Sequence, residues 1–398
     1  MTNILIFFIA FLVIVTFIQI LRVRELIANV EKRDVNEVTE KDNRNQSLLI
    51  GIVGFLFLAS CVWQYLAWGD LILPKASSQH GEIIDKLMIF TMSLIIVVFF
   101  ITNLLLFWFG YKYRKGEGNE VAYYYPHNNK LEIIWTIAPT IVLTAVILYG
   151  LNVWNEVTGP PDEEATIIEI YGKGKGYFSW TARYAGKDNQ LGDADFRIVA
   201  GDNELGVVSN TTKEYLISEY LPTEISKIEE KINISRKFSE KKRLIEDLKK
   251  LKKQKERIIN YFAENPKSSE KLLSAEDDIV TNIVHLVVDK PVLLKFRSQD
   301  VIHSAYLPHF RVQMNCVPGM ITQFAFTPTQ TTEEMKKQEG EDFEFVLLCN
   351  KICGTGHSNM QMKFIVETQD EYDEWMKKQE TLSEKLSQKL SQKLLTQN

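Results

Sequence analysis

The sequence predicts an α+β membrane protein in which four transmembrane helices precede a β-barrel that is interrupted by a helical hairpin. Apolar residues crowd into the first 155 of the 398 positions, and short strand-like patterns follow them. The formal net charge of −5 argues against a general nucleic-acid binder. Six histidines and four cysteines are too few for a disulfide-rich scaffold, but they suffice for one metal site.

Four apolar runs predict the four transmembrane helices. A helix needs roughly 20 apolar residues to cross about 30 Å of hydrocarbon, and its backbone groups must be hydrogen-bonded internally. The runs are residues 4–21, 47–68, 87–111 and 133–151. We do not expect the first run to be a cleaved signal peptide, because its positive charges, Arg22 and Arg24, follow the apolar stretch instead of preceding it.

Loop charge predicts the orientation of these helices. The loop 22–46 holds six Lys or Arg residues and the loop 112–130 holds four, against two in the loop 69–86. Cytoplasmic loops carry the excess of positive charge, so the first and third loops are expected to be cytoplasmic. The N-terminus and everything after residue 152 then lie on the periplasmic side of a bacterial inner membrane.

Past residue 160 the pattern changes to short strands separated by turns, which favours a β-sandwich or barrel. The expected strands are residues 166–171, 279–288, 291–296, 343–348 and 362–368.

Two charged helices are expected within this strand pattern, at residues 223–237 and 240–262. Apolar residues recur at helical spacing in the second of them. Between Thr223 and Lys267 there are 14 Lys or Arg residues and 8 Asp or Glu residues. We interpret the segment as a solvated hairpin inserted in a loop; the alternative is a docking surface for another subunit or for anionic lipid. Residues 371–398, with their repeated Lys-Leu-Ser-Gln, are expected to form a solvated helical tail.

The strongest chemical signal is the segment Cys349-Asn-Lys-Ile-Cys353-Gly-Thr-Gly-His357-Ser-Asn-Met360. Two thiolates, an imidazole and a thioether suit copper, zinc or an iron–sulfur centre. A second histidine, His303, stands at the end of an expected strand and could approach the same loop.

Three interpretations of this segment stay open. A structural zinc site would use the two cysteines and two histidines but not Met360. A disulfide between Cys349 and Cys353 suits an outward-facing domain but leaves the other groups unused. A binuclear copper site uses every group, with both cysteines bridging two ions, one histidine on each ion, and Met360 as a weak axial ligand. Because only the copper site uses all five side chains, we favour copper.

The spacing Cys-x3-Cys-x3-His-x2-Met, with Asp300-Val-Ile-His303 upstream, resembles cytochrome c oxidase subunit II, the carrier of the binuclear copper A centre. A second segment resembles the same family independently: His127-Asn-Asn-Lys-Leu-Glu-Ile-Ile-Trp-Thr-Ile-Ala-Pro139, at the start of a membrane helix. Residues 291–319, which end in Val317-Pro-Gly319, also match. The resemblance covers residues 86–205 and 276–375.

The resemblance implies a cupredoxin-like Greek-key barrel on a two-helix hairpin. It also implies electron transfer from cytochrome c to haem in subunit I, where dioxygen is reduced to water with proton pumping. No Cys-x2-Cys-His occurs, so no haem is expected in this chain. The implied copper ligands are His303, Cys349, Lys351 through its backbone carbonyl, Cys353, His357 and Met360.

Three further site assignments follow from the resemblance. Glu132 matches a carboxylate at the mouth of a proton channel, whereas an ordinary interfacial Glu near a helix N-terminus is the alternative. Lys351 stands where the family usually has a glutamate, so magnesium at the interface with subunit I is doubtful. Electron input is assigned to aromatic residues, for which packing in the barrel core is the alternative: Phe178, Trp180 and Tyr184.

The expected partners are oxidase subunit I, other oxidase subunits, membrane lipid, and cytochrome c or a cytochrome-c-bearing respiratory complex as the electron donor. An acidic face for a basic cytochrome is one interpretation of five carboxylates, and ordinary solvated loops are the other. These are Asp188, Asp193, Asp195, Asp202 and Glu204. The alternative function is a membrane-anchored copper-binding or copper-delivery protein without oxidase activity.

The expected domains follow from these segments. Residues 1–80 form two extra N-terminal transmembrane helices and residues 81–155 the transmembrane hairpin of the family. Residues 156–205 and 276–370 form the copper domain, 206–275 the charged helical insertion, and 371–398 the charged helical tail.

Overall fold

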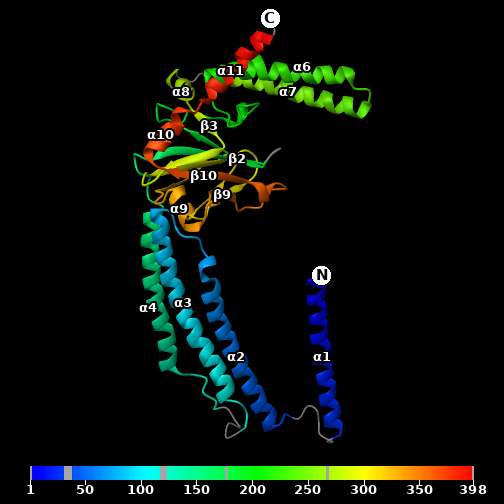
Figure 1. Ribbon diagram of the computed structural model, residues 1–398, viewed down its shortest axis with the longest axis vertical. Helices are drawn as coiled ribbons and strands as arrows, with labels where there is room; N and C mark the ends of the chain where they lie inside the picture. The colour runs from blue at the N-terminus through cyan, green and yellow to red at the C-terminus, as the bar shows by residue number, and fades with distance from the viewer. Residues whose placement is uncertain (1, 31–37, 117–122, 175–177, 266–268, 397–398) are drawn as a thin grey trace. The chain divides into compact units, whose positions relative to one another are not determined.

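The structure, a computed structural model, describes residues 2–30, 38–116, 123–174, 178–265 and 269–396 (Figure 1). The chain divides into two compact units, Met1–Ile72 with Phe90–Leu143, and Leu73–Ile89 with Thr144–Asn398. Each unit is described by itself.

Long apolar helices make up the first unit and continue into the second. They are α1 (Thr2–Val30), α2 (Glu40–Trp68), which runs into the short 3₁₀ helix η1 (Gly69–Leu71), α3 (Gln79–Lys112) and α4 (Asn129–Val157). Among the described residues, three segments are long and apolar enough to cross a membrane: Glu40–Leu71, Gln79–Lys112 and Asn129–Val157. The helix α1 has 29 residues, and its role as a fourth span stays a prediction.

Local sequence explains where these helices begin and how closely they pack. Thr39 and Asp42 form a capping box at the start of α2, in which each side chain accepts a hydrogen bond from the other residue's backbone N–H. In the first unit, α2 and α3 approach so closely at Gly54 that a Cβ there would lie 2.2 Å from the ring of Phe107. Glycine at that position permits the contact.

Two five-stranded sheets form most of the second unit. One has the strand order β3-β2-β1-β5-β8 and the other β4-β10-β9-β6-β7. The strands are β1 (Thr166–Lys173), β2 (Ser179–Tyr184), β3 (Ile279–Thr281), β4 (Ile283–Val287), β5 (Val292–Ser298), β6 (His303–Leu307), β7 (Val312–Cys316), β8 (Thr322–Phe326), β9 (Phe345–Cys349) and β10 (Gln361–Glu367). We call this pair of sheets the β-sandwich; its closure into a Greek-key barrel stays a prediction.

The pairing of strands differs in one place from the sequence prediction. The stretch 279–288, expected as one strand, is two. Its first part, β3, pairs with β2, whereas β4 pairs with β10 in the other sheet. The chain changes sheets at Asn282, and the core-facing positions shift there from Ile279 to Val284 and Leu286, so the alternation is broken between the two parts.

The main core lies between the two sheets. Phe296, Phe310, Phe345 and Phe364 are fully buried there, and the rings of Phe310 and Phe345 stack with centroids 4.6 Å apart. Burying an aromatic side chain of this size contributes about 1.5–3 kcal/mol. The core continues to Met360 and the cysteine at the end of β9.

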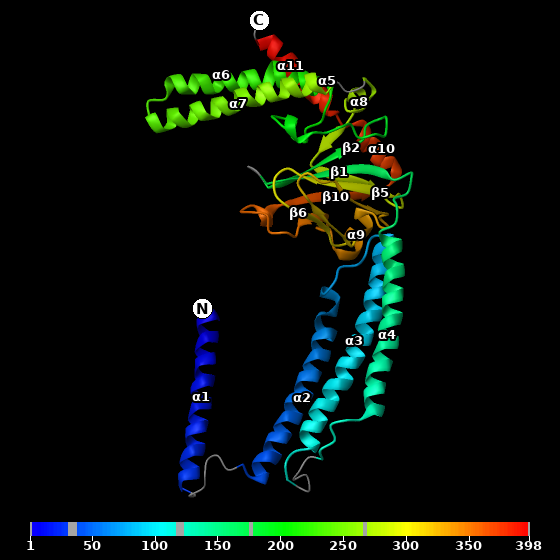
Figure 2. The ribbon, with the colours of Figure 1, turned by 180° about the vertical axis from the view of Figure 1, so that it is seen from behind.

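A second core lies on the outer side of β1, where the insertion meets the C-terminal helix. The insertion contains α5 (Asn210–Glu214), the π-helical turn η3 (Tyr215–Tyr220), α6 (Leu221–Ile234), α7 (Phe238–Glu264) and α8 (Ser269–Ser274). Leu221, Ile258 and Tyr261 from this segment are buried with Tyr171 of β1. The helices α6 and α7 form the hairpin, and Figure 2 shows it leaving the β-sandwich as an arm.

The C-terminal segment is helical, but the prediction that it is solvated is wrong. It contains α10 (Gln369–Lys377) and α11 (Leu382–Thr396). Leu382 and Leu386 of α11 are buried in the second core, and Leu390 packs against it. Leucines four residues apart lie on one helix face, so the repeated Lys-Leu-Ser-Gln produces an apolar stripe that the insertion covers.

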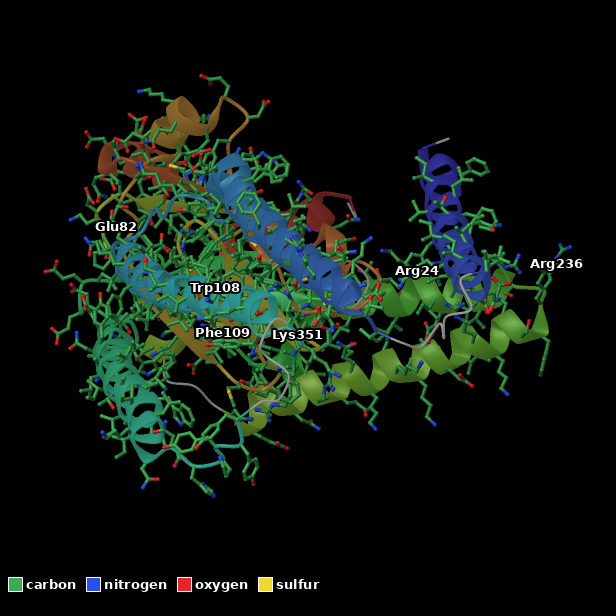
Figure 3. The ribbon with its side chains drawn as sticks, turned by 90° about the horizontal axis from the view of Figure 1, so that it is seen from below. Arg24, Glu82, Trp108, Phe109, Arg236 and Lys351 are labelled. Carbon is green, nitrogen blue, oxygen red and sulfur yellow. The ribbon has the colours of Figure 1, made fainter. Side chains whose placement is uncertain are left out.

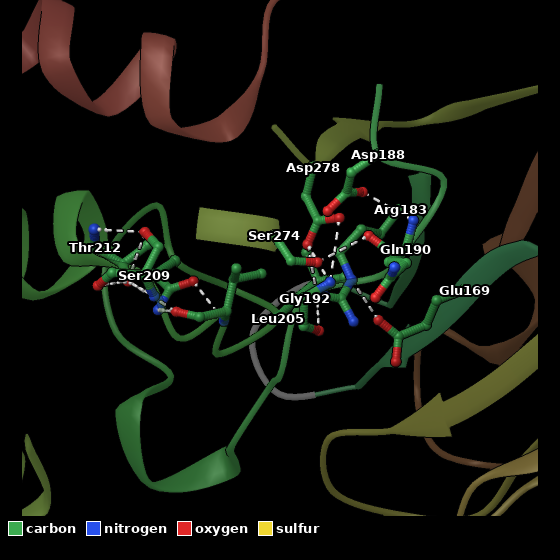
Figure 4. A network of polar contacts seen from close by, with 12 residues as sticks. Glu169, Arg183, Asp188, Gln190, Gly192, Leu205, Ser209, Thr212, Ser274 and Asp278 are labelled. Atoms are coloured by element: carbon green, nitrogen blue, oxygen red, sulfur yellow. Dashed lines mark hydrogen bonds and ion pairs between the residues drawn. The ribbon is translucent and has the colours of Figure 1, made fainter. Parts of the chain in front are cut away.

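A buried network of charges connects the two cores (Figure 4). Arg183 of β2 donates to Glu169 of β1 at 2.7 Å and to Asp278 at 2.9 Å, and all three side chains are less than 5% exposed. Arg297 of β5 also pairs with Glu169 and donates to the carbonyl of Leu205 in the second core at 3.1 Å. Burial opposes the ionisation of Glu169, but the two guanidinium groups outweigh it and hold the pKa of Glu169 below its usual range.

The segment that precedes α3 is fastened to one end of the β-sandwich. The backbone N–H of Ser77 donates to the carbonyl of His309 at 2.7 Å, and the Ser78 hydroxyl donates to the carbonyl of Phe310 at 2.7 Å. Arg311 forms a bidentate pair with Asp85 of α3. Near this end lies α9 (Thr332–Glu339), whose Met335 accepts a hydrogen bond from the Ser77 hydroxyl. The hairpin leaves the β-sandwich at the opposite end (Figures 1 and 2).

Candidate metal centre

The segment with the metal-binding motif is a loop between two paired strands. It starts at Cys349, the last residue of β9, and ends at Met360, just before β10. The two strands are antiparallel neighbours, and the Cys349 N–H donates to the Met360 carbonyl at 3.1 Å, which closes the base of the loop. His303 is the first residue of β6, the strand on the other side of β9. The sheet therefore brings together residues that lie 46 positions apart.

Two cysteine–histidine pairs face each other at this loop. The two Sγ atoms are 3.8 Å apart. Cys349 Sγ lies 4.0 Å from Nδ1 of His303, and Cys353 Sγ lies 3.6 Å from Nδ1 of His357. Ligand atoms of His303, Cys349 and Cys353 all lie within 4.8 Å of one another. Both thiols are free, since a disulfide would need sulfur atoms about 2.05 Å apart.

Asp300 orients the buried histidine and was not assigned a role from the sequence. Its carboxylate lies 3.3 Å from Nε2 of His303 and also accepts the backbone N–H of Gly174 and of Val301. A carboxylate on the outer nitrogen fixes the imidazole so that Nδ1 faces the sulfur atoms. Burial lowers the pKa of His303, against the opposing effect of Asp300, and a neutral imidazole is the form that binds metals. The sequence contains Asp300 three residues before His303, but only the structure shows that the Asp300 carboxylate lies next to Nε2 of His303.

The thiol of Cys353 resists ionisation in the absence of a cation. Burial, together with the neighbouring Cys349, raises the pKa of the Cys353 thiol to about 11. Two adjacent thiolates would repel each other, so both become metal ligands only when a positive ion lies between them. The donor set of two sulfurs and two imidazole nitrogens suits the soft or borderline metals copper and zinc.

Met360 and Lys351 take positions that allow their predicted roles. Met360 is buried at 1% exposure in the same cluster as the two cysteines. The Lys351 carbonyl lies 3.3 Å from Cys349 Sγ, while its side chain is exposed. Figure 3 labels Lys351 among the side chains of this unit. A backbone carbonyl can therefore serve the centre while the ammonium group stays in solvent.

The three aromatic residues assigned to electron input lie in different surroundings. Phe178 covers the loop, because a Cβ on Gly354 or Gly356 would lie within 2.5 Å of its ring. Trp180 is buried, donates to the Met360 carbonyl at 3.4 Å, and meets the ring of His303 at a centroid distance of 5.9 Å.

Tyr184, by contrast, lies at the other end of β2. Its hydroxyl is hydrogen-bonded to the backbone of His285, and its ring packs against Trp375. Only Phe178 and Trp180 therefore touch the loop, and the role given to Tyr184 gains no support from its position.

Glu132 lies in the first turn of α4. Its carboxylate accepts the backbone N–H of Asn128 at 3.3 Å, and the Asn128 side chain caps Leu131 at 3.1 Å. This is the capping contact expected of an interfacial Glu. The role of Glu132 in proton uptake stays a prediction.

The five carboxylates considered as an acidic face are largely matched by cations. Asp195 pairs with Arg197 at 2.6 Å, Asp202 with Lys389 at 2.6 Å, and Glu204 with Lys173. A surface whose charges are paired internally attracts a basic partner weakly.

Comparison with known proteins decides the family. The family model for the transmembrane domain of cytochrome c oxidase subunit II matches residues 66–153, and the model for its periplasmic domain matches residues 264–368. The chain belongs to the cytochrome c oxidase subunit II family. It is thus a subunit of a haem–copper cytochrome c oxidase, an oxidoreductase complex, and its partners include oxidase subunit I. The chain is anchored in the membrane and carries a periplasmic domain.

Two curated relatives are similar over more than two thirds of the chain. The chain is 27% identical over 274 residues to the alternative cytochrome c oxidase subunit 2 of Bradyrhizobium diazoefficiens, which covers 69% of this chain and 72% of that protein. It is 21% identical over 335 residues to cytochrome c oxidase subunit 2 of Synechocystis sp., covering 83% and 82%. The solved periplasmic domain of subunit II of cytochrome oxidase from Bradyrhizobium japonicum covers 55% of this chain and 95% of its own, at 14% identity and a TM-score of 0.26.

Proposed function

We propose that this chain accepts electrons from a cytochrome c at a binuclear copper centre and passes them to haem in subunit I. There dioxygen is reduced to water, and the reaction is coupled to proton pumping. One observation carries the proposal: two thiols 3.8 Å apart, each facing Nδ1 of a different histidine, in one loop. Such an arrangement matches two bridging thiolates with one imidazole on each ion.

Each residue around the loop has its own role in holding this centre. Cys349 and Cys353 would hold the copper ions through their sulfur atoms, and His303 and His357 would each supply an imidazole nitrogen. The Lys351 carbonyl, 3.3 Å from Cys349 Sγ, and the buried Met360 of the same cluster would add weaker ligands. Bound there, a thiolate-bridged copper pair supplies a one-electron carrier. Trp180 and Phe178 exclude water from the loop and lie on the path that an incoming electron would take.

The finer features of the membrane part belong to the same proposal. With α1 as a fourth span, the loops rich in Lys and Arg lie in the cytoplasm and the β-sandwich in the periplasm. Glu132 then lies at the cytoplasmic mouth of a proton channel, where a carboxylate can bind and release protons. The exposed Lys351 leaves no carboxylate at its position for a magnesium ion, since an ammonium group cannot donate electron pairs to a metal.

The test is copper analysis and electron paramagnetic resonance of the purified oxidase. We expect two copper ions per chain in this subunit and a mixed-valence signal shared over both nuclei. Cys349→Ser and Cys353→Ser should each abolish that signal, because each sulfur is needed for both ions. Cys61→Ser removes the free thiol of α2 and is the matched control. One equivalent of zinc without the copper signal would overturn the proposal.

A further inference from the structure

The hairpin is rooted next to the candidate metal centre. Gln254 of α7 donates to the carbonyl of Val199 at 3.4 Å, and the guanidinium group of Arg197 lies 4.6 Å from the ring centroid of Tyr261 in the same helix. In Figures 1 and 2 the hairpin and the loop after β9 extend from the same side of the β-sandwich. Arg236, labelled in Figure 3, marks the far tip of this arm.

A recess of about 650 Å³ lies between the base of the hairpin and the β-sandwich. On the hairpin side it is lined by Lys250, Lys253 and Arg257, which are three and four residues apart and so lie on one helix face. On the other side it is lined by Asp300, whose carboxylate holds His303. Phe196, which is 76% exposed, contributes an apolar surface. A molecule in this recess is therefore separated from a candidate metal ligand by one side chain.

The recess is part of a longer basic surface on α7, which we call the basic ridge. The basic ridge consists of Lys249, Lys250, Lys253 and Arg257, which share one helix face. Glu256 is the one acidic residue between its ends. Within the basic ridge, Lys250 pairs with Asp247 at 3.3 Å.

Most of this positive charge is not compensated. Within the described part of the chain, Lys249, Lys253 and Arg257 form no ion pair. The positive side chains stay accessible; that of Lys250, for example, is 76% exposed. Nearby carboxylates differ from these basic side chains, because Asp195, Asp202 and Glu204 are each paired with a cation.

We propose that the basic ridge and its recess are the docking surface for the electron donor, and that the donor presents an acidic surface to them. This proposal rests on the proposed function, because it needs electrons to enter at the loop beside Asp300. Complementary charge steers association and fixes the orientation of two proteins. An exposed aromatic residue next to an arginine, as with Phe196 and Arg257, is a common composition for the centre of an interface.

Anionic lipid is a poorer occupant of the basic ridge. In the second unit, the residues that lead into the membrane helix α3 are fastened to one end of the β-sandwich through Ser77 and Ser78, and the hairpin leaves at the other end. Electrostatic attraction to lipid falls off within about one Debye length, roughly 8 Å at physiological salt. Within the second unit, the entry to α3 and the base of the hairpin thus lie at opposite ends of the β-sandwich, so the basic ridge does not adjoin the start of a membrane helix.

The experiment compares two forms of one electron donor on the intact oxidase. The probes are a basic ferrous cytochrome c and the same protein after succinylation of its lysines, which makes it acidic. Each ferrous haem gives one electron to the oxidase and becomes ferric, so stopped-flow absorbance measures the rate. At low ionic strength we expect the acidic form to react at least about tenfold faster, and added salt to remove the difference.

Charge reversal on the basic ridge isolates its contribution. The triple variant Lys250→Glu, Lys253→Glu and Arg257→Glu should reverse the preference, so that the basic form reacts faster. A milder triple variant replaces the same residues with glutamine: Lys250→Gln, Lys253→Gln and Arg257→Gln. It should reduce the preference for the acidic form several-fold, and it tests the proposal even if the glutamate variant does not fold. The matched control is Lys290→Glu, Lys337→Glu and Lys378→Glu, which changes the net charge equally at exposed sites outside the recess and should keep the wild-type order.

Three outcomes separate this proposal from the proposed function. Reduction by ascorbate with a small uncharged mediator, together with the copper signal, reports on the metal centre itself; their absence from the wild type would refute the proposed function. A normal signal with equal rates from both probes, or a preference that the ridge variants leave unchanged, would refute the docking surface. If the ridge variants instead lose binding to phosphatidylglycerol vesicles with no change in either rate, the surface binds lipid and the proposal is wrong.

Discussion

The two halves of the candidate metal centre are built in different ways. The inner half, His303 with Cys349, belongs to two neighbouring strands, and its imidazole is fully buried and held by Asp300. The outer half, Cys353 with His357, lies on the loop between β9 and β10. His357 opens the short 3₁₀ helix η4 (His357–Asn359) and is half-buried.

This difference shows that the sheet positions the inner half, whereas loop contacts position the outer half. Strands fix the inner half before any metal binds, because their register is set by the whole sheet. The outer half depends on contacts of the loop with Phe178. A rigid half can fix the position of the centre, whereas a looser half can admit the ions and then close on them.

The largest effect is expected from Glu169→Gln, which weakens the buried charge network of β1, β2 and β5 in the sheet opposite the one that carries the inner half. It leaves the guanidinium groups of Arg183 and Arg297 buried beside a neutral amide. Removing one partner of a buried ion pair typically costs about 3–5 kcal/mol. We expect a loss of this size in the unfolding free energy of the full chain in detergent, measured by denaturant titration with near-UV circular dichroism.

The same variant predicts a change in acid stability. The folded-state pKa of Glu169 lies below its unfolded value of 4.5, so its stabilisation is present above pH 4.5 and is lost as the pH falls through the folded-state pKa. The wild type should therefore lose more stability in this acid range than Glu169→Gln. Glu224→Gln, which breaks the exposed pair with Lys227, is the control and should change stability by less than about 1 kcal/mol. Equal effects of the two variants would show that the buried network does not support the sheet.

Removing the support of His303 should loosen the inner half without unfolding it. Asp300→Ala takes away the carboxylate at Nε2, and loss of such a partner typically lowers metal affinity by about 10–100-fold. Asp300→Asn keeps an oxygen acceptor and should retain most of the affinity. Competition for copper with a chelator of known affinity measures both, with Asp370→Ala on the exposed start of α10 as the control. Unchanged affinity in Asp300→Ala would mean that the strand alone orients the imidazole.

The smallest effect is expected at the tip of the outer half. Lys351→Glu should leave the copper signal nearly unchanged, because only the backbone carbonyl of this residue faces the centre. The new carboxylate should create a site for a divalent cation, which growth with manganese and paramagnetic resonance would detect. Tightly held manganese beside the copper in the wild type would contradict our view of Lys351.

The sequence predicted the outer half of the centre more completely than the inner half. Cys353, His357 and Met360 lie close together along the chain, so spacing alone brings them together. The approach of His303 depends on β6 lying beside β9, and the role of Asp300 depends on the ring orientation of that histidine. Alternating apolar residues show which face of a strand is buried, but they do not name its neighbour.

Contacts between residues distant in sequence also explain why the solvated state expected for the charged helices was wrong. Helical periodicity predicted the two helices of the hairpin, and its charges suggested solvation. The burial of Leu221, Ile258 and Tyr261 at the base depends on Tyr171 and Leu386, which are distant in sequence. A charged helix with few apolar residues is expected to be solvated, unless its single apolar stripe finds a partner elsewhere in the chain.

The burial of α11 in the second core has a consequence for the order in which the molecule matures. A chain made from its N-terminus has its early elements available for folding first. Strand β1 and the hairpin are made well before Leu382 and Leu386, and until these leucines arrive the root of the hairpin exposes apolar surface. The base of the hairpin is therefore covered only after α11 has been made.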